Sequence, residues 1–146
     1  MASVLIVEDD ARLSRMLTAV IQSAGHAVFG TSPTVVRAVE ILNAGRPDAA
    51  VLDLRLKGNE LSYPVAHELK RVGVPFVFMT GFDEQAIDPA FAPSIVLRKP
   101  VRTSDLLTVL RSLTHRPTMD LETAKALRGA STGSGPRVSR TTGRAT

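Results

Sequence analysis

The stretch VLIVEDD, residues 4–10, places three adjacent carboxylates directly after four apolar residues. A short apolar run of this kind is typical of a buried β-strand. Neighbouring carboxylates repel one another, and removing them from water costs free energy unless a cation or hydrogen bonds compensate. The stretch therefore indicates a buried strand that ends at a point where negative charge needs a partner.

Four further apolar runs follow, and amphipathic segments separate most of them. In these segments apolar residues recur at i, i+3, i+4 and i+7, which is the spacing of one helix face. The segment between the fourth and fifth runs contains two prolines and can hold at most a short, irregular helix. The predicted strands are residues 3–7, 26–30, 48–54, 75–80 and 94–97, and the predicted helix faces lie within residues 13–21, 35–42, 65–72 and 106–113.

Near-continuous apolar strands that alternate with amphipathic helices indicate a parallel sheet with helices on both faces. Right-handed crossovers then give an open, doubly wound α/β domain, which we expect to span residues 1–115. Residues 116–146 form a basic tail rich in Ser, Thr, Gly and Arg. We expect this tail to be largely disordered, because so few apolar residues cannot offset the entropy lost on ordering.

Charge and composition exclude several classes of protein. Residues 1–115 contain 12 basic and 12 acidic residues, so the net charge of +4 comes from the tail. The charge of the predicted folded part therefore gives no indication of nucleic-acid binding. The absence of cysteine excludes disulfides and thiolate chemistry. No apolar run is long enough to span a membrane, and we expect a cytoplasmic protein.

Polar residues collect at the predicted carboxyl ends of the strands, where doubly wound sheets bind their ligands. Carboxylates are the oxygen ligands that Mg²⁺ prefers, and an aspartate can attack phosphorus to form an aspartyl-phosphate. A lysine ammonium can neutralise a second phosphoryl oxygen, and a hydroxyl can donate a hydrogen bond to a third. The residues in question are Glu8, Asp9, Asp53, Thr80 and Lys99.

Taken singly, each of these residues also has an ordinary structural explanation. Acids after a strand are often solvated or cap a helix, which is our expectation for Asp10 and an open alternative for Asp53. Thr80 with Gly81 could be a simple turn, and Lys99 a simple strand exit. Only the combination, in this order on this fold, favours Mg²⁺-assisted phosphoryl transfer to Asp53.

With these residues in these positions, the chain resembles a known family, the receiver domains of two-component response regulators. The matching stretches are VLIVEDD, VLDLRLKG, FMTGF and VLRKP, and the resemblance covers about residues 2–115. It implies a flavodoxin-like receiver fold with five parallel strands in the order 2-1-3-4-5. It also implies a cis peptide bond between Lys99 and Pro100.

The resemblance assigns a role to each polar residue. Asp53 would accept the phosphoryl group, Thr80 would be the switch hydroxyl, and Lys99 would contact the phosphate. The implied Mg²⁺ ligands are Asp9, Asp53, the backbone carbonyl of Arg55, and Glu8 either directly or through water.

The switch region departs from the usual receiver pattern. Typical receivers carry Tyr or Phe three residues before the lysine, and here that position is Val96. Phe82 instead follows Thr80 and Gly81, and this arrangement resembles the FAT GUY group of atypical single-domain receivers. The resemblance therefore places the switch at Thr80, Gly81 and Phe82.

The leading hypothesis is a single-domain receiver in a phosphorelay. It would take a phosphoryl group from a sensor histidine kinase and signal by protein–protein interaction or by passing the phosphate to a downstream partner. It would catalyse only its own phosphorylation and dephosphorylation, and residues 116–146 are too few for a DNA-binding or catalytic output domain.

Two other classes of function are weighed against this hypothesis. A pseudo-receiver would bind its partner without phosphate, and the complete set of Asp9, Asp53, Thr80 and Lys99 argues against it. An aspartyl-phosphate phosphohydrolase typically has a second acid two residues after its nucleophile, where this chain has Arg55. The chain also has no room for the cap domain of such an enzyme.

Overall fold

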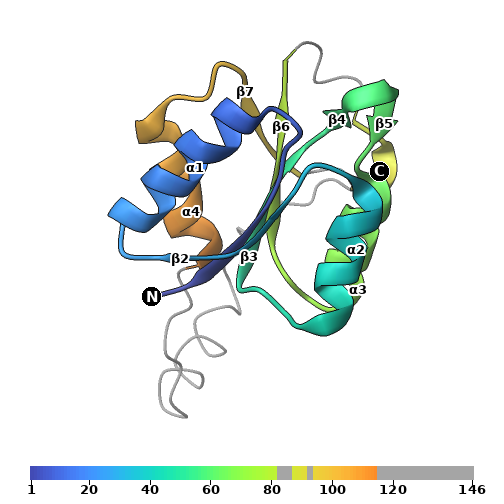
Figure 1. Cartoon of the computed structure of the whole chain (residues 1–146), viewed down its shortest axis with the longest axis horizontal. Coiled ribbons are helices and arrows are strands. Elements are labelled where there is room, and N and C mark those ends of the chain that lie inside the picture. The colour runs from blue at the N-terminus through green and yellow to red at the C-terminus, as the bar shows by residue number, and fades with distance from the viewer. Residues whose placement is uncertain (82–86, 92–93, 115–146) are drawn as a thin grey trace, which may run out of the picture.

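The computed structural model describes residues 1–81, 87–91 and 94–114. Its main sheet contains five parallel strands in the order β2-β1-β3-β6-β7 (Figure 1). Counted along this sheet alone, the order is 2-1-3-4-5, which confirms the predicted doubly wound fold. The strands are β1 (Ser3–Val7), β2 (Ala27–Ser32), β3 (Ala49–Asp53), β6 (Phe76–Thr80) and β7 (Ile95–Arg98).

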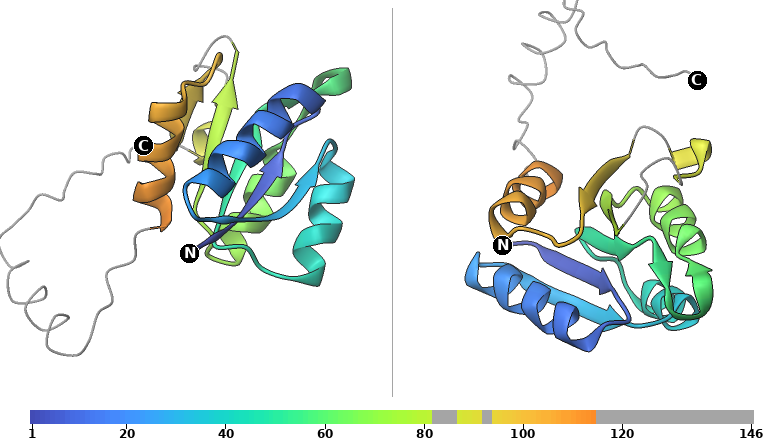
Figure 2. Two further views of the ribbon diagram at one scale, coloured as in Figure 1. Left: turned by 60° about the vertical axis from the view of Figure 1, so that its left-hand side comes forward. Right: turned by 90° about the horizontal axis from the view of Figure 1, so that it is seen from above.

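Among the described residues, two helices cover each face of the sheet. Figures 1 and 2 show α1 (Ala11–Ser23) and α4 (Thr103–Thr114) on one face, and α2 (Val35–Ala44) and α3 (Tyr63–Arg71) on the other. Side chains of β1 alternate between the two resulting cores, with Leu5 on the α2/α3 side and Ile6 on the α1/α4 side. Because both faces are covered, the central strands are apolar except at their ends, as the sequence predicted.

The helix ends follow from particular residues. Asp10 caps α1, because its carboxylate accepts hydrogen bonds from the backbone N–H groups of Arg12 and Leu13. Gly25 follows α1 with φ of 89°, a left-handed conformation that favours glycine. Gly45 follows α2 in an extended conformation that any residue can adopt, so the backbone conformation does not require glycine here. A Cβ atom at Gly45 would lie 2.9 Å from Cζ of Phe29, which shows that close packing requires the glycine.

The connection between β3 and α3 contains an element that the sequence did not predict. It is an antiparallel hairpin of β4 (Arg55–Leu56) and β5 (Glu60–Leu61), joined by the 3₁₀ turn η1 (Lys57–Asn59). Strands of two residues are too short to show a period, and the turn requires positive φ at Gly58 and Asn59. The hairpin leads the chain from Asp53 directly into α3.

The connection between β6 and β7 agrees with the expectation of a short, irregular helix. Its described part contains the 3₁₀ turn η3 (Pro89–Phe91). The predicted cis peptide bond between Lys99 and Pro100 is also present. Phe82 and the tail, residues 116–146, lie outside the described residues. Within the described part of the chain, no helix combines the length and apolar character needed to cross a bilayer.

Candidate functional site

The carboxyl ends of β1, β3, β6 and β7 meet at one edge of the sheet and gather the predicted polar residues there. Nζ of Lys99 lies 3.0 Å from Oδ2 of Asp53 and 3.1 Å from Oε1 of Glu8. Carboxylate oxygens of Glu8, Asp9 and Asp53 all lie within 4.8 Å of one another. The backbone N–H of Lys99 donates to the carbonyl of Thr80 (2.8 Å), which brings the ends of β6 and β7 together. Glu8, Asp53 and Lys99 are thus in direct contact, and Asp9 lies beside the two carboxylates. Thr80 lies at the same edge of the sheet.

Asp53 is held in place by β6 and by the first residue of β4. Asp53 pairs with Met79 in the β3–β6 register, and the N–H of Leu54 donates to the carbonyl of Met79 at 2.8 Å. The N–H of Arg55 donates to Oδ1 of Asp53 at 3.3 Å, while Oδ2 contacts Lys99. Each carboxylate oxygen therefore has a different partner, and together these partners fix the orientation of the side chain.

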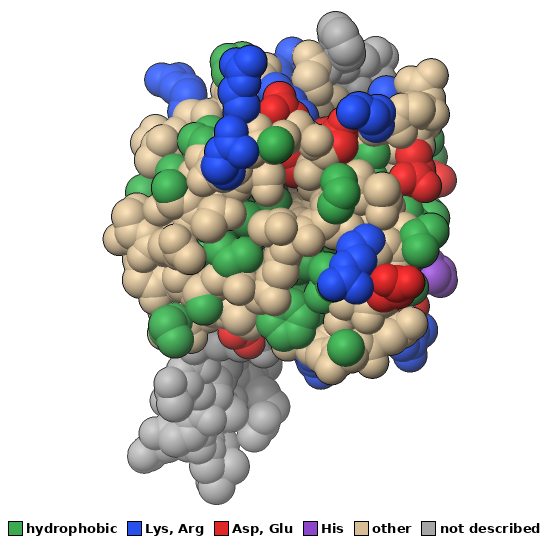
Figure 3. All heavy atoms as spheres, in the orientation of Figure 1, with side chains coloured by type: hydrophobic (Ala, Val, Ile, Leu, Met, Phe, Trp, Pro, Cys, Tyr) green, Lys and Arg blue, Asp and Glu red, His purple; other side chains and the backbone are tan. Residues whose placement is uncertain are grey.

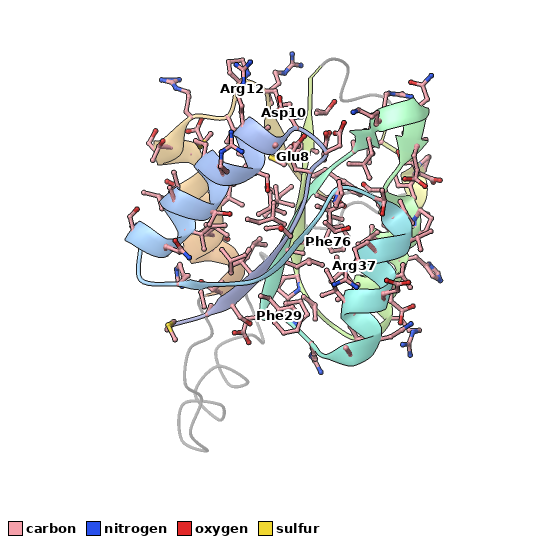
Figure 4. All side chains as sticks on the ribbon, in the orientation of Figure 1. Glu8, Asp10, Arg12, Phe29, Arg37 and Phe76 are labelled. Carbon is pink, nitrogen blue, oxygen red and sulfur yellow. The ribbon has the colours of Figure 1, made fainter. Side chains whose placement is uncertain are left out.

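The three acids of the first loop differ in position and partners. Figure 4 shows Glu8 and Asp10 at the end of the sheet where α1 begins. Asp10 turns its carboxylate toward α1 and caps the helix, as predicted, while its N–H donates to Oε2 of Glu8 at 3.0 Å. Glu8 is buried and Asp9 is half-buried. Asp10 thus stands outside the group of converging carboxylates, although it is adjacent to them in sequence.

Burial strongly affects the charges of this group. Burial raises the pKa of Glu8 to about 7, the bond from the Asp10 N–H opposes this rise, and the charge of Asp53 adds to it. Burial also raises the pKa of Asp53, although Lys99 opposes that shift. Burial alone would lower the pKa of Lys99, but its hydrogen bond to Asp53 and the charges of Asp53 and Glu8 raise it. Lys99 is therefore a permanent ammonium at neutral pH, and it stabilises the ionised form of Asp53.

The donor set fits a hard divalent cation. Three carboxylates converge on one ammonium, so the fully ionised group carries excess negative charge. Mg²⁺ takes oxygen ligands and commonly retains several waters, so Glu8, Asp9 and Asp53 suit it well. The backbone carbonyl of Arg55 remains a prediction as a further ligand. In the space-filling view, acidic side chains lie among Lys and Arg side chains at the upper edge of the molecule (Figure 3).

The predicted switch residues are only partly described. Thr80 is buried, with 6% of its surface exposed, at the end of β6, and Gly81 follows it on the surface. Phe82 lies outside the described residues. Sequence reasoning missed Tyr63 and Lys70, which contact the connection between β6 and β7 from α3. The contacting residues lie 20 and 25 positions apart in the sequence, and no periodic pattern relates residues at that distance.

Comparison with known proteins agrees with this geometry. The family model for the response regulator receiver domain matches residues 4–111, and the chain therefore belongs to the family of response regulator receiver domains. Members of this family are generally regulatory domains rather than catalytic ones, and they generally bind Mg²⁺ through acidic residues. The resemblance inferred from the four sequence stretches is thus confirmed.

Among individual proteins, the chain is similar to SdrG from Sphingomonas melonis Fr1. It is 35% identical to the solution structure of SdrG, with a TM-score of 0.70, and the match covers 79% of this chain and 98% of SdrG. The solution structure of the BeF3-activated conformation of SdrG from Pseudomonas melonis Fr1 is also 35% identical, with a TM-score of 0.67 and coverage of 77% and 96%.

The chain is also similar to the positive alginate biosynthesis regulatory protein of Pseudomonas aeruginosa. The two are 35% identical over 143 residues, which cover 92% of this chain and 56% of the relative. The chain spans about half the length of the curated relatives that it matches. The similarity therefore concerns only part of each of these relatives.

Proposed function

We propose that this receiver accepts a phosphoryl group on Asp53 from a sensor histidine kinase in the cytoplasm, with Mg²⁺ bound. It then signals through protein–protein interaction or passes the phosphate to a relay partner. The observation that carries this proposal is the 3.0 Å contact between Lys99 and Asp53 at the edge where Glu8 and Asp9 converge. The similarity to SdrG, a protein with a BeF3-activated conformation, supports it.

The reaction requires an ionised Asp53 in a buried position. A carboxylate oxygen of Asp53 attacks phosphorus and forms a new O–P bond, while the P–N bond of the kinase phosphohistidine breaks and its electron pair stays on the imidazole nitrogen. Lys99 keeps the carboxylate charged before attack and is placed to contact a phosphoryl oxygen afterwards. The hydroxyl of Thr80 is our candidate donor to another phosphoryl oxygen.

The metal ion would be held by the three converging carboxylates. Glu8, Asp9 and Asp53 are its candidate ligands, together with the carbonyl of Arg55. When bound, Mg²⁺ supplies positive charge that offsets the phosphoryl oxygens and the carboxylates. The N–H of Arg55 holds Oδ1 of Asp53 at 3.3 Å, which orients the carboxylate independently of the metal.

Labelling with a small phosphodonor tests the proposal. Incubation with acetyl phosphate and Mg²⁺ should add one phosphoryl group, as read from the intact mass of the protein. Asp53→Asn should abolish the addition, and removal of Mg²⁺ with a chelator should block it. Asp10→Asn is the matched control, since asparagine also caps helices and Asp10 faces α1 rather than the site.

The outcomes separate the proposal from its alternatives. Equal labelling of Asp53→Asn and the parent protein would refute Asp53 as the acceptor. A complete lack of labelling would favour a receiver that acts without phosphate. Repeated turnover of a phosphomonoester would instead indicate a phosphohydrolase.

A further inference from the structure

Tyr63, the first residue of α3, contacts the connection between β6 and β7 through both its ring and its hydroxyl. Its ring stacks on Phe91 with 5.3 Å between centroids and 2° between planes. Its hydroxyl oxygen accepts a hydrogen bond from the N–H of Asp88 at 2.7 Å. Lys70, two turns along α3, donates to the carbonyl of Ala90 at 3.2 Å and lies 5.7 Å from the Phe91 ring centroid. The described part of the connection is therefore bound to α3 at several points.

The ring of Tyr63 also contacts the strand that carries Thr80. It meets Phe78 of β6 edge-on, with centroids 5.9 Å apart and an interplanar angle of 81°. Phe91 packs edge-on against the same Phe78 at 6.1 Å. Tyr63 thus lies where β6, α3 and the connection that follows β6 meet, and such aromatic contacts stabilise the arrangement beyond simple burial.

Backbone hydrogen bonds join this meeting point to Asp53. Leu54, the residue after Asp53, donates to the carbonyl of Met79 at 2.8 Å. The carbonyl of the same Leu54 accepts from the N–H of Ser62 at 3.0 Å. Ser62 is fully buried and immediately precedes Tyr63. A short path of covalent and backbone hydrogen bonds therefore links Asp53 to Tyr63.

We propose that Tyr63 is the positioning residue that transmits the state of Asp53 to residues 87–91, the described part of the connection between β6 and β7. This inference rests on the proposed phosphoryl acceptance. A phosphoryl group adds about two negative charges and strong acceptor oxygens next to Thr80, where the connection begins. Tyr63 is linked to Asp53 through Leu54 and Ser62, so a shift at Asp53 changes the stacking of Tyr63 on Phe91 and its hydrogen bond with Asp88.

The composition of the chain makes this proposal directly measurable. Tyr63 is the only tyrosine, and the chain has no tryptophan, so tyrosine fluorescence reports this one side chain. Adding Mg²⁺ and beryllofluoride to the full chain should change the Tyr63 emission in a saturable manner. Asp53→Asn should abolish the change, and Mg²⁺ alone should not reproduce it.

The outcomes distinguish this inference from the proposed function. Labelling of Asp53 by acetyl phosphate together with an unchanged Tyr63 emission under beryllofluoride would overturn the inference and leave the proposed function standing. If neither labelling nor a change in emission occurs, both fail. The same emission change in Asp53→Asn would show that Tyr63 responds to something other than the acceptor.

A conservative variant isolates the hydroxyl group. Tyr63→Phe keeps the stacking but removes the acceptor for Asp88, so exchange of the Asp88 amide hydrogen should accelerate about two- to tenfold, as expected for one lost hydrogen bond. Labelling of Asp53 should persist, whereas the effect of beryllofluoride on Asp88 exchange should largely disappear. Thr108→Val, which removes a hydroxyl from α4 on the opposite face, is the control and should leave Asp88 unchanged. An equal beryllofluoride effect in Tyr63→Phe and the parent would refute the role of Tyr63.

Discussion

Nζ of Lys99 lies 3.0 Å from Oδ2 of Asp53, although 46 positions separate the two residues in sequence. The contact depends on the sheet, because β3 and β7 both flank β6 and all three strands end at the same edge. The backbone bond from Lys99 to the carbonyl of Thr80 fixes the point from which the lysine side chain reaches back. The pair is therefore a direct product of the strand order, and its energetics can be tested.

Replacing Lys99 should impair phosphorylation more than folding at neutral pH. In Lys99→Met, Asp53 loses the ammonium that favours its charged form, so its pKa should rise further above the ordinary aspartate range. We expect the initial labelling rate with acetyl phosphate to fall on the order of a hundredfold, as for other lost charge-stabilising donors. Lys57→Met, in the exposed turn η1, is the control and should label normally. Normal labelling of Lys99→Met would contradict the assigned role.

Magnesium affinity should depend on the protonation of Glu8. Burial raises its pKa to about 7, so below that pH the metal must displace a proton to use this carboxylate. The dissociation constant for Mg²⁺, measured by titration calorimetry, should rise up to about tenfold for each pH unit below 7. Glu8→Gln should bind Mg²⁺ more weakly but with a flatter pH profile. An unchanged profile in that variant would assign the titration to another group.

Without divalent metal, the stability of the fold should fall as the pH rises. The pKa of Glu8 is raised from 4.5 to about 7, so the folded state holds this proton more tightly than the unfolded chain does. The resulting stabilisation is complete below pH 4.5 and is lost as the pH rises through 7, and it amounts to at most about 3 kcal/mol. Asp53 shifts in the same direction and should add to the trend.

Denaturant unfolding in the presence of a chelator measures this dependence. The free energy of unfolding should decrease between about pH 5 and pH 8 in the parent protein and much less in Glu8→Gln. Saturating Mg²⁺ should remove most of the decrease, because the metal stabilises the ionised carboxylates. A stability that rises with pH over this range would contradict the shift assigned to Glu8.

Phosphoryl acceptance should need only the receiver itself. In a chain that ends at Thr114, the last residue of α4, all described contacts of Glu8, Asp53 and Lys99 remain available. We expect this truncated protein to be labelled at Asp53 at a rate close to that of the full chain, with a similar unfolding midpoint. Loss of labelling or a large drop in the midpoint would show that residues beyond 114 contribute to the folded domain.

Sequence patterns predicted the parts of this fold that depend on burial and strand order. The apolar runs of β1 and β3 are buried on both faces, so they are recognisable without a partner, and the acids that follow them share one edge as a matter of topology. The β4–β5 hairpin escaped prediction because two-residue strands carry no period. The stacking of Tyr63 on Phe91 could not be predicted from the sequence, because only folding brings these two residues together.

The capping of α1 by Asp10 has an evolutionary consequence for the stretch VLIVEDD. The three neighbouring acids should differ in the substitutions they tolerate. Only Asp10 can be replaced by other good capping residues such as Asn, Ser or Thr. A deep mutational scan scored for labelling should therefore accept several residues at Asp10, while Asp9 remains nearly invariant. Three residues with the same charge would thus be under different selection.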